Sequence, residues 1–260
     1  MIQHFRLLFR HRELLLMWAL REIKVRYKQS LLGGTWAVLQ PLSLMIVFSV
    51  IFTNFVKIPT DGVPYPVFSY SALLPWTFFA TSISFAVPAL TQNMNLVTKI
   101  YFPREILPAA AVAGAFVDFL VASVVFAAIL ILYRVPLGAP LLLMPLLLAI
   151  QILLTLGIVM FASALNVFFR DVRFVIPLAL QLWMYATPII YPVSLVPERF
   201  RPLYMLNPMA GLVEAYRATA LQGALPNWDY VGTAAAVSAM TFLLGYLFFK
   251  RVEGQFADII

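Results

Sequence analysis

The segment that decides the fold reads NLVTKIYFPRE at residues 95–105. Long apolar stretches lie on both sides of it, so a short polar segment interrupts a chain otherwise suited to hydrocarbon. Pro103 pushes Phe102 out of the α region, which ends a short helix by about residue 101. Glu105 then falls in the first turn of the next helix, where the helix dipole favours an anion. The stretch therefore predicts a short helix, a break and a long helix.

The composition predicts an all-α membrane protein in one domain over residues 1–260. Hydrophobic residues make up 63% of the chain and charged residues 11%, whereas a soluble domain carries about 25% charged residues. Six segments approach the ~20 residues that cross ~30 Å of hydrocarbon. They are residues 31–55, 67–91, 103–133, 141–168, 174–191 and 230–249.

The basic residues orient these six spans. If both termini are cytoplasmic, the inner side holds 13 of the 18 Lys and Arg residues, as the positive-inside rule requires. This placement also accounts for the net charge of +7 without nucleic acid as a partner. The orientation puts residues 95–105 in the cytoplasm and predicts a multi-pass protein of the plasma membrane.

Residues 1–29 are expected to form an amphipathic helix on the inner membrane surface, facing anionic lipid. Apolar residues recur there at helical spacing, beside basic ones. The simplest role is a juxtamembrane anchor, and the alternative is contact with an anionic head group of a substrate. The residues considered for that contact are Arg6, Arg10 and Arg12.

The connection over residues 192–229 carries too many charges for a seventh crossing. We expect two short re-entrant helices on the outer side, within residues 195–223. One starts at Pro197, with Glu198 in its first turn. The other has Asn207 as its N-cap, Pro208 at its first position and Gly223 as its stop.

Aromatic residues gather toward the outer ends of the second and fifth spans. An interfacial belt explains Trp and Tyr at this depth, and a pathway on which sugar rings slide is the alternative. The residues considered for a pathway are Trp36, Trp76, Phe79, Trp183 and Tyr185. Asp118 is the one clear carboxylate inside a span. We expect it to be hydrogen-bonded, either to neighbours near Ser123 or to a hydroxyl of another span, because a single carboxylate makes a poor proton relay.

The chain has no Gly-rich phosphate loop and no cysteine, so it lacks a visible site for ATP hydrolysis or for a thiolate-bound metal. Neither a bound cofactor nor a metal is expected, and a partner must supply energy. A membrane-embedded transferase acting on lipid-linked sugars would need clustered acidic residues. The acidic candidates are instead scattered along the chain: Asp118, Asp171, Glu198 and Glu214.

Four colinear segments resemble permease subunits of ABC transporters that export polysaccharides. The first is N-x-x-L-V-x-K-x-x-F-P-R-E-x-L-P at residues 93–108. The others are RYKQSLLGGTWAVLQP (26–41), LNVFFRDVRFVIP (165–177) and NPMAGLVEAYR (207–217). Together they cover both cytoplasmic and outer parts of the chain.

The resemblance implies a homodimer in a bacterial inner membrane, bound to two copies of a separate ATPase that uses ATP and Mg. Residues 93–102 are then a coupling helix in a cleft of that ATPase, although a helix lying on the membrane surface remains the alternative. The implied coupling residues are Asn95, Leu96, Lys99, Tyr101, Phe102, Arg104 and Glu105.

The resemblance also implies that the two short outer helices form a gate. The implied gate residues are Tyr191, Glu198, Arg199, Glu214 and Arg217. The cargo is then a polysaccharide linked to a polyprenyl diphosphate, such as an O-antigen. An exporter of a drug or another lipid is the alternative within the same family.

Overall fold

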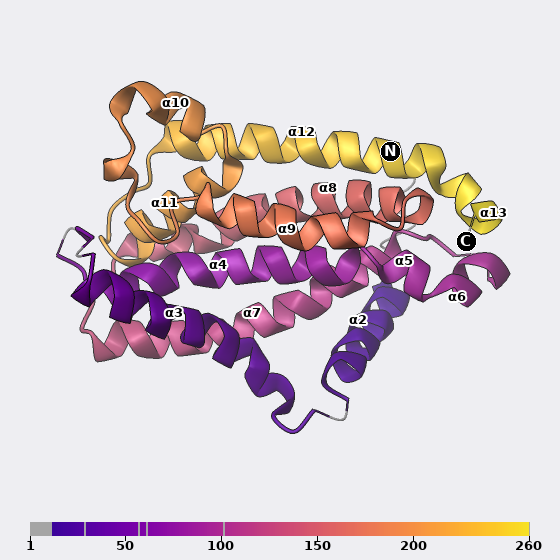
Figure 1. Cartoon of the computed structure of the whole chain (residues 1–260), viewed down its shortest axis with the longest axis horizontal. Helices are drawn as coiled ribbons and strands as arrows, with labels where there is room; N and C mark the ends of the chain where they lie inside the picture. Colours follow the sequence, from indigo (N-terminus) through magenta and orange to yellow (C-terminus); the bar gives the residue numbers. More distant parts are fainter. Residues whose placement is uncertain (1–11, 29, 57, 61, 101, 260) are drawn as a thin grey trace.

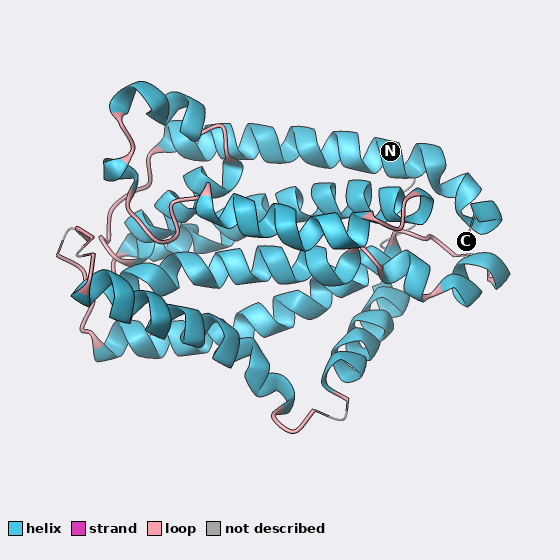
Figure 2. Ribbon diagram, viewed as in Figure 1, coloured by secondary structure: helices cyan, strands magenta, loops and turns pink. Residues whose placement is uncertain are grey.

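The computed structural model describes residues 12–28, 30–56, 58–60, 62–100 and 102–259, and these residues form helices and loops without a strand (Figure 2). The prediction of an all-α protein is therefore confirmed. The long helices run side by side along one axis (Figure 1).

Four helical stretches of the described chain are long and apolar enough to cross a membrane. They are Gly33–Asn54, Ile106–Leu132, Ala139–Phe168 and Trp228–Gln255. They contain helices α3 (Trp36–Asn54), α7 (Ile106–Leu132), α8 (Met144–Phe168) and α12 (Trp228–Val252).

Two further helices lie in the same bundle. Helix α4 (Tyr65–Ala86) interleaves Ser, Thr, Tyr and Pro with its apolar residues. Helix α9 (Val172–Tyr185) has 14 residues, which gives a length of about 21 Å at 1.5 Å per residue. Both run in nearly the same direction as α8 and α12 in Figure 1, and α3 and α7 are inclined to them.

Proline residues explain where two expected spans are cut short. The expected helix over 67–91 divides into α4 and α5 (Ala89–Gln92), and Pro88 lies at the junction. The expected helix over 174–191 ends at Tyr185, shortly before Pro188. A residue that precedes proline is pushed out of the α region, so helices end near such a position.

The two ends of the bundle differ in what they carry. Helices α2 (Arg12–Tyr27), α6 (Met94–Lys99) and α13 (Phe256–Ile259) lie at one end, which we call the α6 end. Helices α10 (Arg201–Tyr204) and α11 (Pro208–Ala220) lie at the opposite α11 end (Figure 1).

Helix α11 has the boundaries that its residues predict. The Asn207 side chain accepts from the Met209 amide at 3.1 Å and caps the helix, and Pro208 is its first residue. Gly223 follows the helix with a φ of +59°, which is a left-handed conformation that glycine adopts without strain. The short turn before it is formed by Glu198–Phe200 and α10, after Pro197.

Helices α8 and α12 meet backbone to backbone where Gly157 faces Gly245 and Phe242. A Cβ atom on Gly157 would lie 2.5 Å from the backbone nitrogen of Phe242, and one on Gly245 would overlap the Gly157 carbonyl. Gly211 of α11 likewise lies against the Tyr230 carbonyl of α12, 2.9 Å from a hypothetical Cβ. Close backbone approach at small residues is how membrane helices associate tightly.

Helix α2 packs on α7 instead of lying apart from the bundle. It passes close to Gly114, where the Glu22 Cβ would lie 3.7 Å from a hypothetical Cβ, an ordinary van der Waals contact. The expected apolar stripe on α2 therefore divides. Ile23 and Tyr27 are partly buried, while Leu16 and Leu20 face outward with 62% and 57% exposure.

Candidate functional sites

Helix α6 has one buried side and one exposed side at the end of the bundle. Val97, with 2% exposure, belongs to an apolar cluster that includes Leu107 and Phe256. On the other side Asn95 and Lys99 are exposed, and Ile100 after the helix has 55% exposure. The exposed side therefore combines polar groups and an apolar residue that no other part of the described chain covers.

The expected coupling residues divide between these two sides. Asn95 and Lys99 lie on the exposed side, whereas Leu96 and Phe102 are half-buried, with Phe102 packed on the Val97 cluster. Tyr101 lies outside the described residues.

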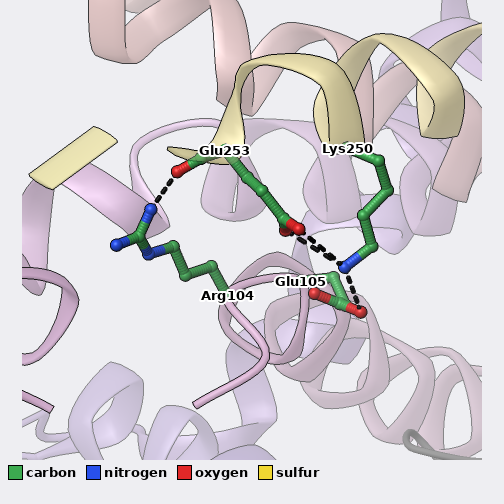
Figure 3. A network of polar contacts seen from close by, with 4 residues as sticks. All are labelled: Arg104, Glu105, Lys250 and Glu253. Carbon is green, nitrogen blue, oxygen red and sulfur yellow. Dashed lines mark hydrogen bonds and ion pairs between the residues drawn. The ribbon is translucent and has the colours of Figure 1, made fainter. Parts of the chain in front are cut away.

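Arg104 and Glu105 point inward, and Figure 3 shows their partners near the end of α12. Glu105 is 1% exposed, and its Oε1 lies 2.8 Å from Lys250 Nζ. Lys250 also bridges to Glu253 at 3.0 Å, and Arg104 donates to the Glu253 carbonyl oxygen. In this conformation Glu105 has no surface to offer a partner, unlike Asn95 and Lys99 on the exposed side of α6.

Arg217 lies in the core at the α11 end, not on its surface. It is 3% exposed, and its Nη2 donates to the Ile189 carbonyl at 2.8 Å. Its Nη1 donates to the Pro188 carbonyl, and its guanidinium lies 3.7 Å from the centre of the Phe68 ring. Arg217 therefore satisfies the carbonyls of the irregular segment after α9.

The other expected gate residues occupy different environments. Glu198 and Arg199 are exposed, and Glu214 is half-buried beside Arg217 in the wall of a small cavity. The Tyr191 hydroxyl lies 3.0 Å from the Tyr204 hydroxyl. The structure therefore brings Glu214 and Arg217 together and leaves Glu198 and Arg199 apart from them.

Asn207 joins α9 to α11 more extensively than a cap requires. Its Oδ1 also accepts from Trp183 Nε1 at 2.9 Å, and its Nδ2 donates to Thr187 Oγ1 at 3.0 Å. The sequence indicates the cap alone, because Trp183 is 24 residues away and no local pattern links the two.

Two of the aromatic residues considered for a pathway are core residues. Trp76 is 4% exposed and Phe79 is fully buried, with its ring 5.2 Å from that of half-buried Trp183. Trp36 and Tyr185 are each 52% exposed. Trp76 and Phe79 therefore pack in the core of the bundle in this conformation.

Asp118 is held by the N-terminal helix. Its Oδ2 pairs with Arg26, and its Oδ1 accepts from the Tyr27 hydroxyl at 2.7 Å. Burial, reinforced by the Asp118 carboxylate, raises the pKa of Tyr27 to about 12, so this hydroxyl keeps its proton at neutral pH. The carboxylate is hydrogen-bonded as expected, but through residues of α2.

A cavity of about 310 Å³ lies beside this pair. It is partly open, residues of α2, α3, α4 and α7 line it, and Trp36 and Gln40 form part of its wall. Arg6 and Arg10 lie outside the described residues, as does the side chain of Arg12. Among the residues that the structure describes, no three His, Asp or Glu side chains gather as a metal site.

Comparison with known proteins identifies the family. Residues 13–221 match the family described as ABC-2 type transporter. The chain is 32% identical over 263 residues to the O-antigen export system permease protein RfbA of Myxococcus xanthus, covering all of both chains. It is 29% identical to RfbA of Klebsiella pneumoniae, with 95% of each chain covered. It is 23% identical to the polysialic acid transport protein KpsM of Escherichia coli, covering 90% of this chain and 91% of that protein. The chain therefore belongs to the ABC-2 type transporter family.

Proposed function

We propose that this chain is the membrane subunit of an ATP-driven exporter that moves a lipid-linked polysaccharide of the O-antigen type across the bacterial inner membrane. The observation that carries the proposal is the exposed side of α6, which is anchored by Val97 and presented at the end of the bundle. The full-length similarity to export permeases supports it.

The energy source is a separate ATPase that binds ATP and Mg, with two copies serving two copies of this chain. A docking surface of a transient complex combines apolar contacts with a polar rim. Ile100 supplies the apolar contact, and Asn95 and Lys99 supply the rim. The chain itself has no Gly-rich phosphate loop.

Helices α3, α4, α7, α8, α9 and α12 form six crossings, with both termini in the cytoplasm. The 14 residues of helix α9 do not reach across the ~30 Å hydrocarbon layer, so residues 186–192 complete the crossing. Irregular backbone at membrane depth must be satisfied by protein, and the Arg217 bonds to Pro188 and Ile189 supply this. The outward apolar face of α9, with Leu178 and Leu182 about 60% exposed, suits lipid or the second copy.

Sidedness is the first test. The chain lacks cysteine, so single variants Thr98→Cys and Leu203→Cys can be labelled with a membrane-impermeant maleimide in intact cells and in inverted vesicles. Both positions are exposed in the structure. We expect Thr98→Cys to react only in inverted vesicles and Leu203→Cys only in cells. Reaction of Thr98→Cys from outside the cell would refute ATPase docking at α6.

Transport is the second test. The chain and its ATPase are reconstituted in liposomes with a radiolabelled polyprenyl-diphosphate glycan, and ATP-dependent protection of the glycan from an external glycosidase is measured. Protection that requires both proteins and ATP supports the proposal. Transfer of the glycan without ATP would indicate a transferase, and normal glycan export in a deletion strain would indicate an exporter of a drug or another lipid.

A further inference from the structure

The C-terminal segment packs against the buried side of α6. After α12 ends at Val252, a short turn leads into α13, which packs against α6 (Figure 1). Phe256 is fully buried, and its ring centre lies 5.4 Å from that of Phe249. Both belong to the same cluster as Val97. Residues that are remote in sequence thus form the surface on which α6 rests.

A polar network reinforces this contact beside the apolar cluster (Figure 3). Lys250 Nζ lies between the carboxylates of Glu105 and Glu253, and Arg104 donates to the Glu253 carbonyl. Glu105 Oε2 is buried without a hydrogen-bond partner, so Lys250 is the principal compensation for this carboxylate. Removing one member of a buried ion pair leaves an uncompensated charge and is strongly disruptive.

Helix α6 needs such support. It has six residues, and isolated helices shorter than about 12 residues are marginal in water. It joins α7 through Ile100, whose backbone is extended with ψ +132°, and the segment that follows. A force on α6 would bend this connection unless the end of the connection that joins α7, at Arg104 and Glu105, were fixed.

We propose that residues 250–256 form a latch that fixes the ATPase-docking helix α6 to α7 and α12. Lys250 of this latch and its partner Glu105 are positioning residues. They determine how much glycan is exported for each ATP molecule hydrolysed. The inference rests on the proposed function. Helix α12 spans 25 residues, about 37 Å at 1.5 Å per residue, and at its far end Tyr230 lies against Gly211 of α11. The latch therefore ties α6 to a helix that reaches the opposite end of the bundle.

The test compares Lys250→Met and Glu105→Gln with Arg251→Met. Arg251 is the next residue along, is exposed, and takes part in no ion pair within the described chain, so its variant loses the same charge but leaves the ion pairs of Lys250 with Glu105 and Glu253 intact. The double variant Glu105→Lys with Lys250→Glu restores the ion pair between positions 105 and 250 with the charges exchanged, but it places a second carboxylate beside Glu253, so only part of the network is regained. It distinguishes loss of the pair from loss of either side chain.

Two measurements separate the latch from the proposed function. A spin label on Thr98→Cys reports the mobility of α6 in nanodiscs without the ATPase. The ratio of glycan exported to ATP hydrolysed reports coupling in the reconstituted complex. We expect both single latch variants to increase label mobility and to lower the ratio by about tenfold, a size typical of lost coupling between sites. Arg251→Met should leave both unchanged, and the exchanged pair should recover both in part.

The inference is overturned if Lys250→Met and Glu105→Gln both show the label mobility and export ratio of the unmodified chain. If Lys250→Met does not fold, Glu105→Gln decides, because it removes the charge of Glu105 and leaves the Lys250–Glu253 ion pair in place. If the unmodified complex shows no ATP-dependent export, the proposed function fails. The label measurement then still decides whether residues 250–256 hold α6.

Discussion

Replacing Gly157 by alanine tests the crossing of α8 and α12 directly. The added Cβ would lie 2.5 Å from the Phe242 nitrogen and 2.6 Å from its Cα. Both are backbone atoms, so no change of rotamer relieves the overlap. The backbones must separate by about 0.9 Å to restore an ordinary 3.4 Å contact, in an interior packed as densely as a crystal.

The expected change in unfolding free energy is a loss from poorer packing, offset in part by a gain in helix propensity. Overpacking of a tight core costs about 1–3 kcal/mol, and the upper end applies because α8 and α12 form the most extensive helix pair among the described elements. A gap of 0.5–1 Å elsewhere in the interface removes about a quarter to a half of the dispersion energy of each atom pair there. Alanine regains about 1 kcal/mol of helix propensity over glycine. We therefore expect a net loss of about 2 kcal/mol.

The assay is thermal unfolding in nanodiscs, followed by tryptophan fluorescence. A loss of about 2 kcal/mol corresponds to a midpoint lower by about 4–8 °C. Gly232→Ala in α12 is the matched control, because nothing lies within 4 Å of its hypothetical Cβ, and its midpoint should stay equal or rise. A midpoint of Gly157→Ala at or above that of Gly232→Ala would refute the reasoning.

Three further changes probe the sites. Asp118→Asn leaves Arg26 buried without its countercharge and should cost about 3 kcal/mol; denaturation that matches the unmodified chain would show that the pair contributes little. Asn207→Ala removes the α11 cap and the bond from Trp183, so we expect a loss of about 1–2 kcal/mol and a red shift of Trp fluorescence; unchanged emission would contradict the contact. Lys99→Glu alters the exposed side of α6 alone, so ATPase affinity should fall about tenfold with an unchanged unfolding midpoint; equal binding in a pull-down titration would exclude Lys99 from the docking surface.

Local chemistry was sufficient to predict several helix boundaries. Pro103 breaks the chain between α6 and α7, and α6 ends at Lys99, before that break. Asn207 and Gly223 limit α11 because one side chain caps a helix start and the other residue tolerates a positive φ. These effects act between residues that are close in the chain, so they can be predicted from the sequence of one protein.

The partners of the buried charges could not be predicted in this way. Arg26 and Asp118 are 92 residues apart, and Arg104 contacts a carbonyl 149 residues away. Nothing local distinguishes Glu105, which is buried, from an exposed carboxylate in the first turn of a helix. Likewise, the aromatic pattern identifies Trp76 and Phe79 as membrane residues, but their burial depends on packing against α9.

The Gly157 crossing bears on how far the latch can act. Because α8 and α12 meet backbone to backbone, neither can shift by more than a few tenths of an ångström without the other. The latch therefore connects α6 to a stiff helix pair and not to a single flexible helix. It follows that Lys250→Met and Gly157→Ala should lower the export ratio for different reasons. Lys250→Met frees α6 from the pair, whereas Gly157→Ala loosens the pair while the label on α6 stays immobile. Equal label mobility in both variants would show that α6 and the crossing do not respond separately, and that the latch is not a distinct element.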